Sequence, residues 1–413
     1  MSCSHDQYDL AITGADDAVA AGYNAYVGEF LSYGAELRAL FDIADATPQA
    51  PLINAHAAAL HLAFEGAEGW DAAREYLSRM ERHMGEATER ERLFCAAVSA
   101  WAALDFTAAH AALDELTVRW PGDLCAIKWG QYHAFNLGDA GALLRFGERA
   151  RIAHENRPYA HGMIAFALEQ NHHLEDAEEE GLRATEIAID DAWAHHAVAH
   201  VMDAGGRPSD GVRWLDHCAH TWDRKGVFIR DHNWWHAALF RLSLGQNDDA
   251  VSIFDERLWG AWPEFPQEQI GAVSMLWRLE LRGADVGARW DPIVEQIRMR
   301  MDEHLLPFHD LHYPYALARA GTGAEADAFL TGMRKRAETT TDATATVWTD
   351  IAVPTGEAII AFLRGNHGDA ARTLNALAPS LHRIGGSHAQ RHVFEETIAA
   401  CSARSGVASG REL

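Results

Sequence analysis

The chain has 413 residues, of which 48% are hydrophobic and 23% are charged, a composition typical of a folded protein with a sizeable core. Its 60 acidic and 35 basic residues give a formal net charge of −25, and a surface that acidic repels nucleic acid and anionic lipid. We therefore expect a small-molecule ligand or a peptide as the partner, and neither nucleic acid nor a membrane.

The N-terminal segment and the cysteines indicate the compartment. The first 18 residues are acidic and lack a basic stretch followed by an apolar core, so they do not resemble a secretory signal. No run of 18 apolar residues occurs, so no membrane-spanning helix is expected. Five scattered cysteines without a CxxC pair are typical of a reducing compartment. The sequence predicts a cytoplasmic protein.

Short turns recur along the first part of the chain, and the first four are spaced by about 34 residues, which is the period of a tetratricopeptide helix–turn–helix unit. Gly or Asn ends one helix in a left-handed cap, and Asp or Ser starts the next. The turns are Leu104–Phe106, Leu137–Asp139, Asn171–His173, Gly205–Arg207 and Leu244–Gln246. The sequence therefore predicts an all-α, tetratricopeptide-like α-solenoid of roughly ten to sixteen helices, without a sheet and with a concave pocket rich in His and Trp.

Breaks in this pattern predict the domain organisation. Residues 1–260 are expected to form tetratricopeptide-like repeats, and the proline-containing segment Ala261–Gln269 interrupts them. Residues 261–405 are expected to continue as less regular helical repeats packed on the first set, with a polar loop at Thr339–Thr349. Residues 406–413 are predicted to be a frayed tail.

Histidines at helical spacing are the most informative feature. His196, His200 and Asp203 follow one another at i, i+4 and i+7 and share one face of a helix, whereas His195 points elsewhere. His232 and His236 form a second i, i+4 pair. Both pairs precede a turn, so both lie on the first helix of successive units, which lines the concave face. We expect the two pairs to be neighbours across the groove.

Three interpretations of these histidines remain open from the sequence. They could be structural, hydrogen-bonded to backbone carbonyls between solenoid helices. His196, His200, His232 and His236 could instead hold a divalent transition metal, because imidazole suits zinc, iron, copper and nickel. The segment is not a zincin motif, because Ala197 stands where HExxH peptidases carry Glu. The third interpretation is metal-free acid–base chemistry by a histidine beside a carboxylate.

Further polar and aromatic residues complete the predicted site. Candidate catalytic residues are His196, His200, His232, His236, Asp203, Asp310 and His312. Candidate substrate-binding residues are Asn233, Trp193, Trp235, His388 and Arg391, of which the tryptophans would exclude water or stack on a ring. No phosphate-binding Gly-rich loop and no GxSxG elbow occurs, which argues against nucleotide binding and a serine nucleophile.

The order of these motifs resembles the tetratricopeptide repeat protein 38 family over nearly the whole chain. The matching segments are Trp193–His200, HNWWH at His232–His236 with Leu239, LGQNDDAVSIFD, Asp310-x-His312 and GGSHAQRHVF. Asp203 stands where relatives carry Glu, and His388 replaces an Asn of some members. The resemblance implies a tetratricopeptide-like helical array with polar motif residues, and no particular reaction, cofactor or substrate.

Two functions are compatible with these observations. The first is a small-molecule-binding solenoid with a His-based reaction centre in its groove, with or without the assistance of a metal, acting as a hydrolase or lyase. The alternative is a non-catalytic adaptor that binds a peptide or protein partner in the groove. Little Lys in the groove segments favours the first, because adaptor grooves usually clamp a carboxylate with Lys, Arg and Asn. Exposed solenoid ends also make a homodimer an expectation.

Overall fold

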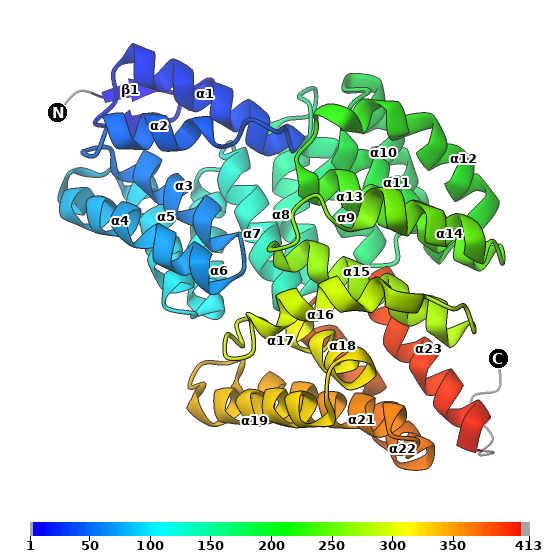
Figure 1. Ribbon diagram of the computed structural model, residues 1–413. Helices are drawn as coiled ribbons and strands as arrows, with labels where there is room; N and C mark the ends of the chain where they lie inside the picture. Colours follow the sequence, from blue (N-terminus) through cyan, green and yellow to red (C-terminus); the bar gives the residue numbers. More distant parts are fainter. Residues whose placement is uncertain (1–2, 406–413) are drawn as a thin grey trace. The chain divides into compact units, whose positions relative to one another are not determined.

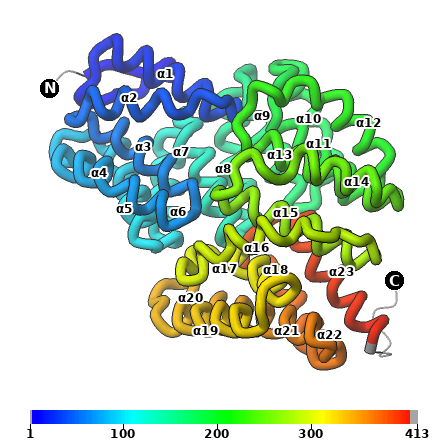
Figure 2. Tube along the Cα trace, viewed as in Figure 1, coloured from blue at the N-terminus to red at the C-terminus, as the bar shows by residue number. Residues whose placement is uncertain are grey.

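A computed structural model describes residues 3–405, and its helices follow one another along almost the whole of that range (Figures 1 and 2). The nearly all-α, tetratricopeptide-like fold class is confirmed. The predicted tail at residues 406–413 lies outside the described residues. By its internal contacts the chain divides into two units, Met1–Phe135 with Asp139–Asn233, and Asn136–Gly138 with Trp234–Leu413. The predicted boundary at residue 260 stays a prediction.

The first unit opens with a small hairpin that the sequence did not predict. Strands β1 (Cys3–His5) and β2 (Ala11–Thr13) pair antiparallel, with Ser4 opposite Ile12. The expectation of no sheet is therefore wrong at the N-terminus, because a stretch this short gives too little alternation to detect. The helices that follow are α1 (Asp17–Ser32), α2 (Ala39–Ala46), α3 (Pro51–Leu62), α4 (Ala67–His83), η1 (Met84–Glu86), α5 (Glu89–Ala102), α6 (Phe106–Arg119), α7 (Leu124–Asn136), α8 (Ala140–Ala153), α9 (Ala160–Gln170), α10 (Leu174–Ile187), α11 (Ala192–Ala204), α12 (Pro208–Cys218) and η2 (Ala219–Arg224).

Helix α13 (Val227–Ser243) contains the division between the units, since Asn233 belongs to the first and Trp234 to the second. The second unit continues with α14 (Asn247–Ile253), the π-helix η3 (Phe254–Leu258), α15 (Pro266–Leu281), η4 (Gly287–Arg289), α16 (Trp290–Arg298), α17 (Pro307–Asp310), α18 (Tyr313–Ala320), α19 (Gly323–Thr339), α20 (Ala345–Val347), the π-helix η5 (Trp348–Ala352), α21 (Val353–Leu363), α22 (His367–Leu377), η6 (Ala378–Ile384) and α23 (His388–Ser405). The helices outnumber the predicted range because short ones such as α17 and α20 occupy connections.

The predicted turns are regular in the backbone. Leu104, Gly138, His172 and Gly206 all have positive φ, between 62° and 68°, and each lies 34 residues after the one before. At Leu104 the amide donates to the Trp101 carbonyl, and the next amide, of Asp105, donates to the Ala100 carbonyl. This pair of bonds is a Schellman cap, which satisfies the last carbonyls of a helix. The same positive-φ residue closes α13 at Gly245, with φ 74°.

The second unit contains a short polar loop and a long apolar helical segment. The polar loop predicted at Thr339–Thr349 is shorter in the structure and covers residues 340–344, between the end of α19 at Thr339 and the start of α20 at Ala345. Helical residues Ala345–Leu363 are long and apolar enough to cross a membrane by length and composition, with a mean hydropathy of 1.2. As 61% of that window is buried inside the protein, the same segment also fits a core helix, and it is weak support for a span.

Tryptophans fill the cores of both units, which explains much of their frequent use. Trp101 and Trp222 are almost fully buried in the first unit. Trp277, Trp290 and Trp348 are almost fully buried in the second. Burial of side chains this large stabilises each unit by roughly 25 cal/mol per Å² of apolar surface removed from water.

Candidate metal centre

Helix α11 starts at a well-formed cap that sets the orientation of its histidines. The Asp191 carboxylate accepts hydrogen bonds from the backbone amides of Trp193 and Ala194, at 3.1 and 3.0 Å. From this start, the four-residue spacing places His196 and His200 one turn apart on the same face. The helix ends at Ala204, before the glycine turn.

Helix α13 carries the second pair. It follows η2 and Gly226, whose amide donates to the Tyr33 carbonyl at 2.7 Å. His232 and His236 again lie one turn apart, on one continuous helix. Asn233 is fully buried and donates from Nδ2 to the Ala192 carbonyl at 3.1 Å, so it ties α13 to the first turn of α11.

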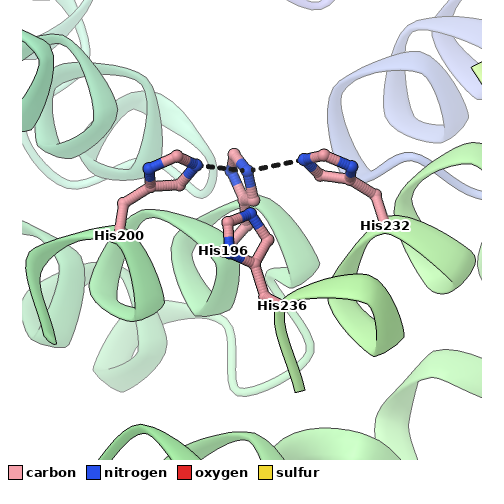
Figure 3. Close-up of side chains that lie close together, drawn as sticks. All are labelled: His196, His200, His232 and His236. Carbon is pink, nitrogen blue, oxygen red and sulfur yellow. Dashed lines mark hydrogen bonds between the residues drawn. The ribbon is translucent and has the colours of Figure 1, made fainter. Parts of the chain in front are cut away.

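The two pairs meet, as the sequence predicted. The Nε2 atom of His196 lies 3.0 Å from Nε2 of His200 and 3.1 Å from Nε2 of His232. Figure 3 shows the ring of His196 between those of His200 and His232, with the ring of His236 beside it. One ring nitrogen from each of the four residues lies within 4.8 Å of all the others. Asp203, in the last turn of α11, is half-exposed and is not part of this group.

The four-histidine cluster (His196, His200, His232 and His236) is largely removed from water. His196 is 2% exposed, and His200 and His236 are each 1% exposed. His232 is half-buried, and desolvation lowers its pKa from 6.5 to about 4. At neutral pH this ring is therefore uncharged and keeps a lone pair, which is the form that binds a metal ion.

The contacts at His196 are difficult to satisfy with protons alone. A ring nitrogen has either one proton or one lone pair, so it forms one well-directed hydrogen bond. Nε2 of His196 nevertheless has two imidazole nitrogens within 3.1 Å. A cation between the rings would accept lone pairs from all of them and resolve this conflict.

A buried carboxylate lies behind His200, and sequence reasoning missed it. Oε2 of Glu169, at the end of α9, is 3.6 Å from Nδ1 of His200, and each side chain is 1% exposed. The neighbouring Gln170 donates from its side-chain amide to Glu169. The only signal in the sequence is an acid near the end of an apolar helix two helices earlier, which is too common a pattern to single out.

Aromatic rings flank the cluster on the first unit. Trp193 lies 4.6 Å from His196 between ring centroids, and Tyr33 stacks on Trp193 at 5.3 Å. Phe228 stacks on His232 at 5.6 Å with an interplanar angle of 12°. Tyr33, Trp193 and Phe228 are each half-buried, so they present a partly exposed aromatic surface beside the cluster.

Three other predicted site residues, Trp235, His388 and Arg391, have contacts of their own in the second unit. Trp235 is buried, with its ring 5.0 Å from that of His236 and the Arg278 guanidinium 5.2 Å above it. Arg391 donates to the carbonyls of Gly385 and Gly386 and lies 3.4 Å from Nδ1 of His388. These contacts place Arg391 and His388 at the start of α23.

Asp310 and His312 belong to a buried turn of the second unit. Oδ2 of Asp310 is 2.5 Å from Nδ1 of His304, and burial raises the pKa of the Asp310 carboxyl. Nδ1 of His312 donates to the Phe308 carbonyl at 2.9 Å, and burial lowers the pKa of His312 to about 3. Neither residue is among the four whose ligand atoms lie within 4.8 Å of one another.

His195 points away from the cluster, as predicted. Its Nε2 atom lies 3.0 Å from the Ile189 carbonyl, and its Nδ1 atom accepts from the Trp222 indole at 3.2 Å. Both ring nitrogens therefore have structural partners. His195 therefore has a structural role, whereas His196, the next residue, belongs to the four-histidine cluster.

The fold and the cluster define a tetratricopeptide-like helical repeat protein with a four-histidine centre. No protein-family profile matches the sequence. Among solved structures, the chain is similar to a monomeric mutant of IFIT1 with Gppp-AAAA, with a TM-score of 0.44, 11% sequence identity, and coverage of 96% of this chain and 95% of that chain.

This comparison corrects the expectation about nucleic acid. The IFIT1 structure was solved with the capped RNA Gppp-AAAA, and the expected exclusion of a nucleic-acid partner is withdrawn. Its premise was the net charge of −25, which is a sum over the whole sequence. Such a sum does not describe any one local surface, and local surfaces are what bind phosphates.

Proposed function

We propose that this chain is a metal-dependent hydrolase or lyase that acts on a small molecule, with a divalent transition metal held by the four-histidine cluster. The observation that carries the proposal is that the four imidazoles offer ligand atoms within 4.8 Å of one another. The four ligands lie on α11 and α13. It also retains the cytoplasmic location and the resemblance to the tetratricopeptide repeat protein 38 family.

The spacing of the nitrogens fits a metal ion. Metal–nitrogen bonds of about 2.0–2.1 Å put neighbouring ligand nitrogens about 3.0 Å apart in an octahedral site and about 3.4 Å apart in a tetrahedral one. The separations of 3.0 and 3.1 Å between Nε2 of His196 and the Nε2 atoms of His200 and His232 are close to these values. Small ring movements would therefore suffice to place all four nitrogens around one ion.

The number of ligands narrows the choice of metal. Four imidazoles would saturate a tetrahedral zinc ion, which is the arrangement of structural zinc sites. Iron, manganese, cobalt and nickel accept five or six ligands, so a four-histidine site leaves a position for water or substrate. A reactive centre at these residues therefore favours a metal of higher coordination number.

Each part of the site has a role in this proposal. The bound ion would polarise a substrate carbonyl or supply a metal-bound hydroxide. His232 is the half-buried member of the cluster, and it borders the aromatic surface of Tyr33, Trp193 and Phe228. Substrate would approach from this side, where the rings exclude water and offer stacking partners.

Metal analysis of the purified protein, combined with activity screening, tests the proposal. Wild-type protein should contain about one equivalent of a transition metal, and the double variant H196A/H200A should contain none. H161A is a matched control, because His161 is a buried histidine of the same unit whose Nδ1 atom pairs with Glu180. Tightly bound zinc without hydrolase or lyase activity would indicate a structural site. Absence of metal together with peptide binding would favour the adaptor.

A further inference from the structure

We infer that Glu169 is a positioning residue that fixes the tautomer of His200 and offsets part of the charge of the metal ion. This inference rests on the proposed function, because it assigns a role at the same centre. It identifies a carboxylate from a third helix, α9, as part of the site.

The geometry sets the two nitrogens of His200 to different tasks. Nε2 faces His196 at 3.0 Å, whereas Nδ1 faces Oε2 of Glu169 at 3.6 Å. A histidine that binds a metal through one nitrogen characteristically directs the other N–H at a carboxylate, which fixes the ring and raises its basicity. His200 is thus oriented to bind through Nε2.

Gln170 helps to hold this carboxylate in place. Its side-chain amide donates to Oε2 of Glu169, the same oxygen that faces His200. Gln170 is itself buried. Glu169 is therefore oriented by a neighbour on its own helix, as a residue that positions a ligand needs to be.

Charge supplies the second part of the argument. An ionised carboxylate that is 1% exposed is costly unless a positive charge lies near it. Imidazole ligands bind a metal in their neutral form, so they would leave both positive charges of a divalent ion uncompensated, and Glu169 would offset one of them. At 3.6 Å the two atoms lie just beyond hydrogen-bond distance, so a small side-chain rotation on metal binding would let Nδ1–H donate to the carboxylate.

The chain contains a matched pair for comparison. Nδ1 of His161 lies 2.5 Å from Oε2 of Glu180, and Glu180 also lies 3.7 Å from Arg151. The Glu180 side chain is 20% exposed, and the pair is not part of the four-histidine cluster. E180Q therefore removes a histidine–glutamate contact of the same type without touching the proposed centre.

Cobalt(II) titration of the full-length chain, stripped of metal and reloaded, tests this role. E169Q should weaken cobalt affinity by about 10- to 100-fold and shift the visible absorption of the bound ion, because the ligand field of His200 changes. E180Q should leave both unchanged. The unfolding temperature of each metal-free variant reports on folding separately.

The possible outcomes test the role of Glu169 separately from the proposed metal centre. If wild-type protein takes up no cobalt, the metal centre itself is refuted. If wild-type protein binds cobalt and E169Q binds it with the same affinity and spectrum, only the role of Glu169 is overturned. Should E169Q not fold, Q170L removes the amide that orients Glu169, and it should weaken cobalt binding several-fold; unchanged binding would equally overturn the inference.

Discussion

His56 shows what a structural histidine looks like in this chain. Its Nε2 and Nδ1 atoms lie 2.9 and 3.2 Å from the hydroxyl groups of Tyr23 and Tyr26. Each ring nitrogen thus has its own partner, and the ring stacks on Phe94 at 4.2 Å. His196 differs, because one of its nitrogens faces two other imidazoles. This difference, rather than burial, marks the four-histidine cluster as a candidate site.

Replacing one member of the cluster should remove metal while the fold survives. We expect H236Q to lower the metal content well below one equivalent, because Gln keeps the hydrogen-bonding capacity and much of the volume of the ring but is a poor ligand for these metals. Plasma emission spectrometry of protein purified without added metal measures the content.

Asn233 supplies the control for that prediction. N233A loses the hydrogen bond to the Ala192 carbonyl and should destabilise the protein by about 1–3 kcal/mol, measured by denaturant unfolding, while the metal content stays at the wild-type level. The opposite pattern, with metal retained in H236Q, would assign His236 to packing.

At this scale the sequence predicts the cluster only in part. The i, i+4 spacing of both pairs is local, so it can be read directly, and the repeat period then places the two pairs on neighbouring first helices. Glu169 lies 31 residues before His200 in the sequence, and the two side chains meet only in the folded chain. No spacing pattern in the sequence predicts this contact. Asp310 and His312 have the same residue types as the cluster, and only the structure shows that their partners are His304 and a backbone carbonyl.

The turns between paired helices are alike in backbone but differ in what surrounds them. A Cβ atom at Gly206 would have open space around it, whereas a Cβ atom at Gly138 would lie 2.0 Å from the His382 carbonyl oxygen. Both residues have positive φ, 64° and 68°. The positive φ thus favours glycine at both positions, and at Gly138 the close approach of the His382 carbonyl also excludes a side chain.

Alanine at these two positions should separate the cost of a positive φ from the cost of the close contact with the His382 carbonyl. G206A should lower the free energy of unfolding by roughly 1–2 kcal/mol, the cost of left-handed backbone for an L-residue. G138A should cost clearly more, because the backbone of η6 has to shift as well. Equilibrium denaturation in urea measures both, and equal losses would show that η6 yields freely at this contact.

The helix pairs could be predicted from the residues of the turns between them, because the signals for a turn lie within a few residues of one another. The residues at two left-handed positions could not be predicted in this way. Leucine and histidine take the left-handed position at Leu104 and His172, where the sequence suggests Gly or Asn. The helix ends are held by the same backbone hydrogen bonds in either case, so the repeat tolerates these residues at a cost in backbone strain.

Buried histidines across the whole chain make its stability depend on pH. Burial lowers the pKa of His56, His133 and His312 to about 3. Their folded-state pKa values lie below the unfolded value of about 6.5, so the native state stays neutral while the unfolded chain takes up protons. Stability is therefore present above about pH 6.5 and is lost as the pH falls toward 3, by about 1.4 kcal/mol per pH unit for each such residue.

The variant H133F isolates one of these contributions. His133 is buried against Trp101 and Tyr132, with ring centroids 4.8 and 5.2 Å away, so a phenyl ring should fit. In metal-free protein, the loss of unfolding free energy between about pH 6 and 4 should be shallower than in the wild type by about 1.4 kcal/mol per pH unit. A slope identical to the wild type would mean that His133 is already protonated in the native state.

The burial of the cluster also governs how quickly an ion could come and go. Three of the rings are 1–2% exposed, so a chelator could reach a bound metal only past His232, the half-buried member. The exchange rate would then follow the movement of His232 and of the aromatic rings beside it, as well as the affinity of the imidazoles. Metal bound during expression would accordingly leave slowly, and removing it before reloading would take long exposure to a chelator.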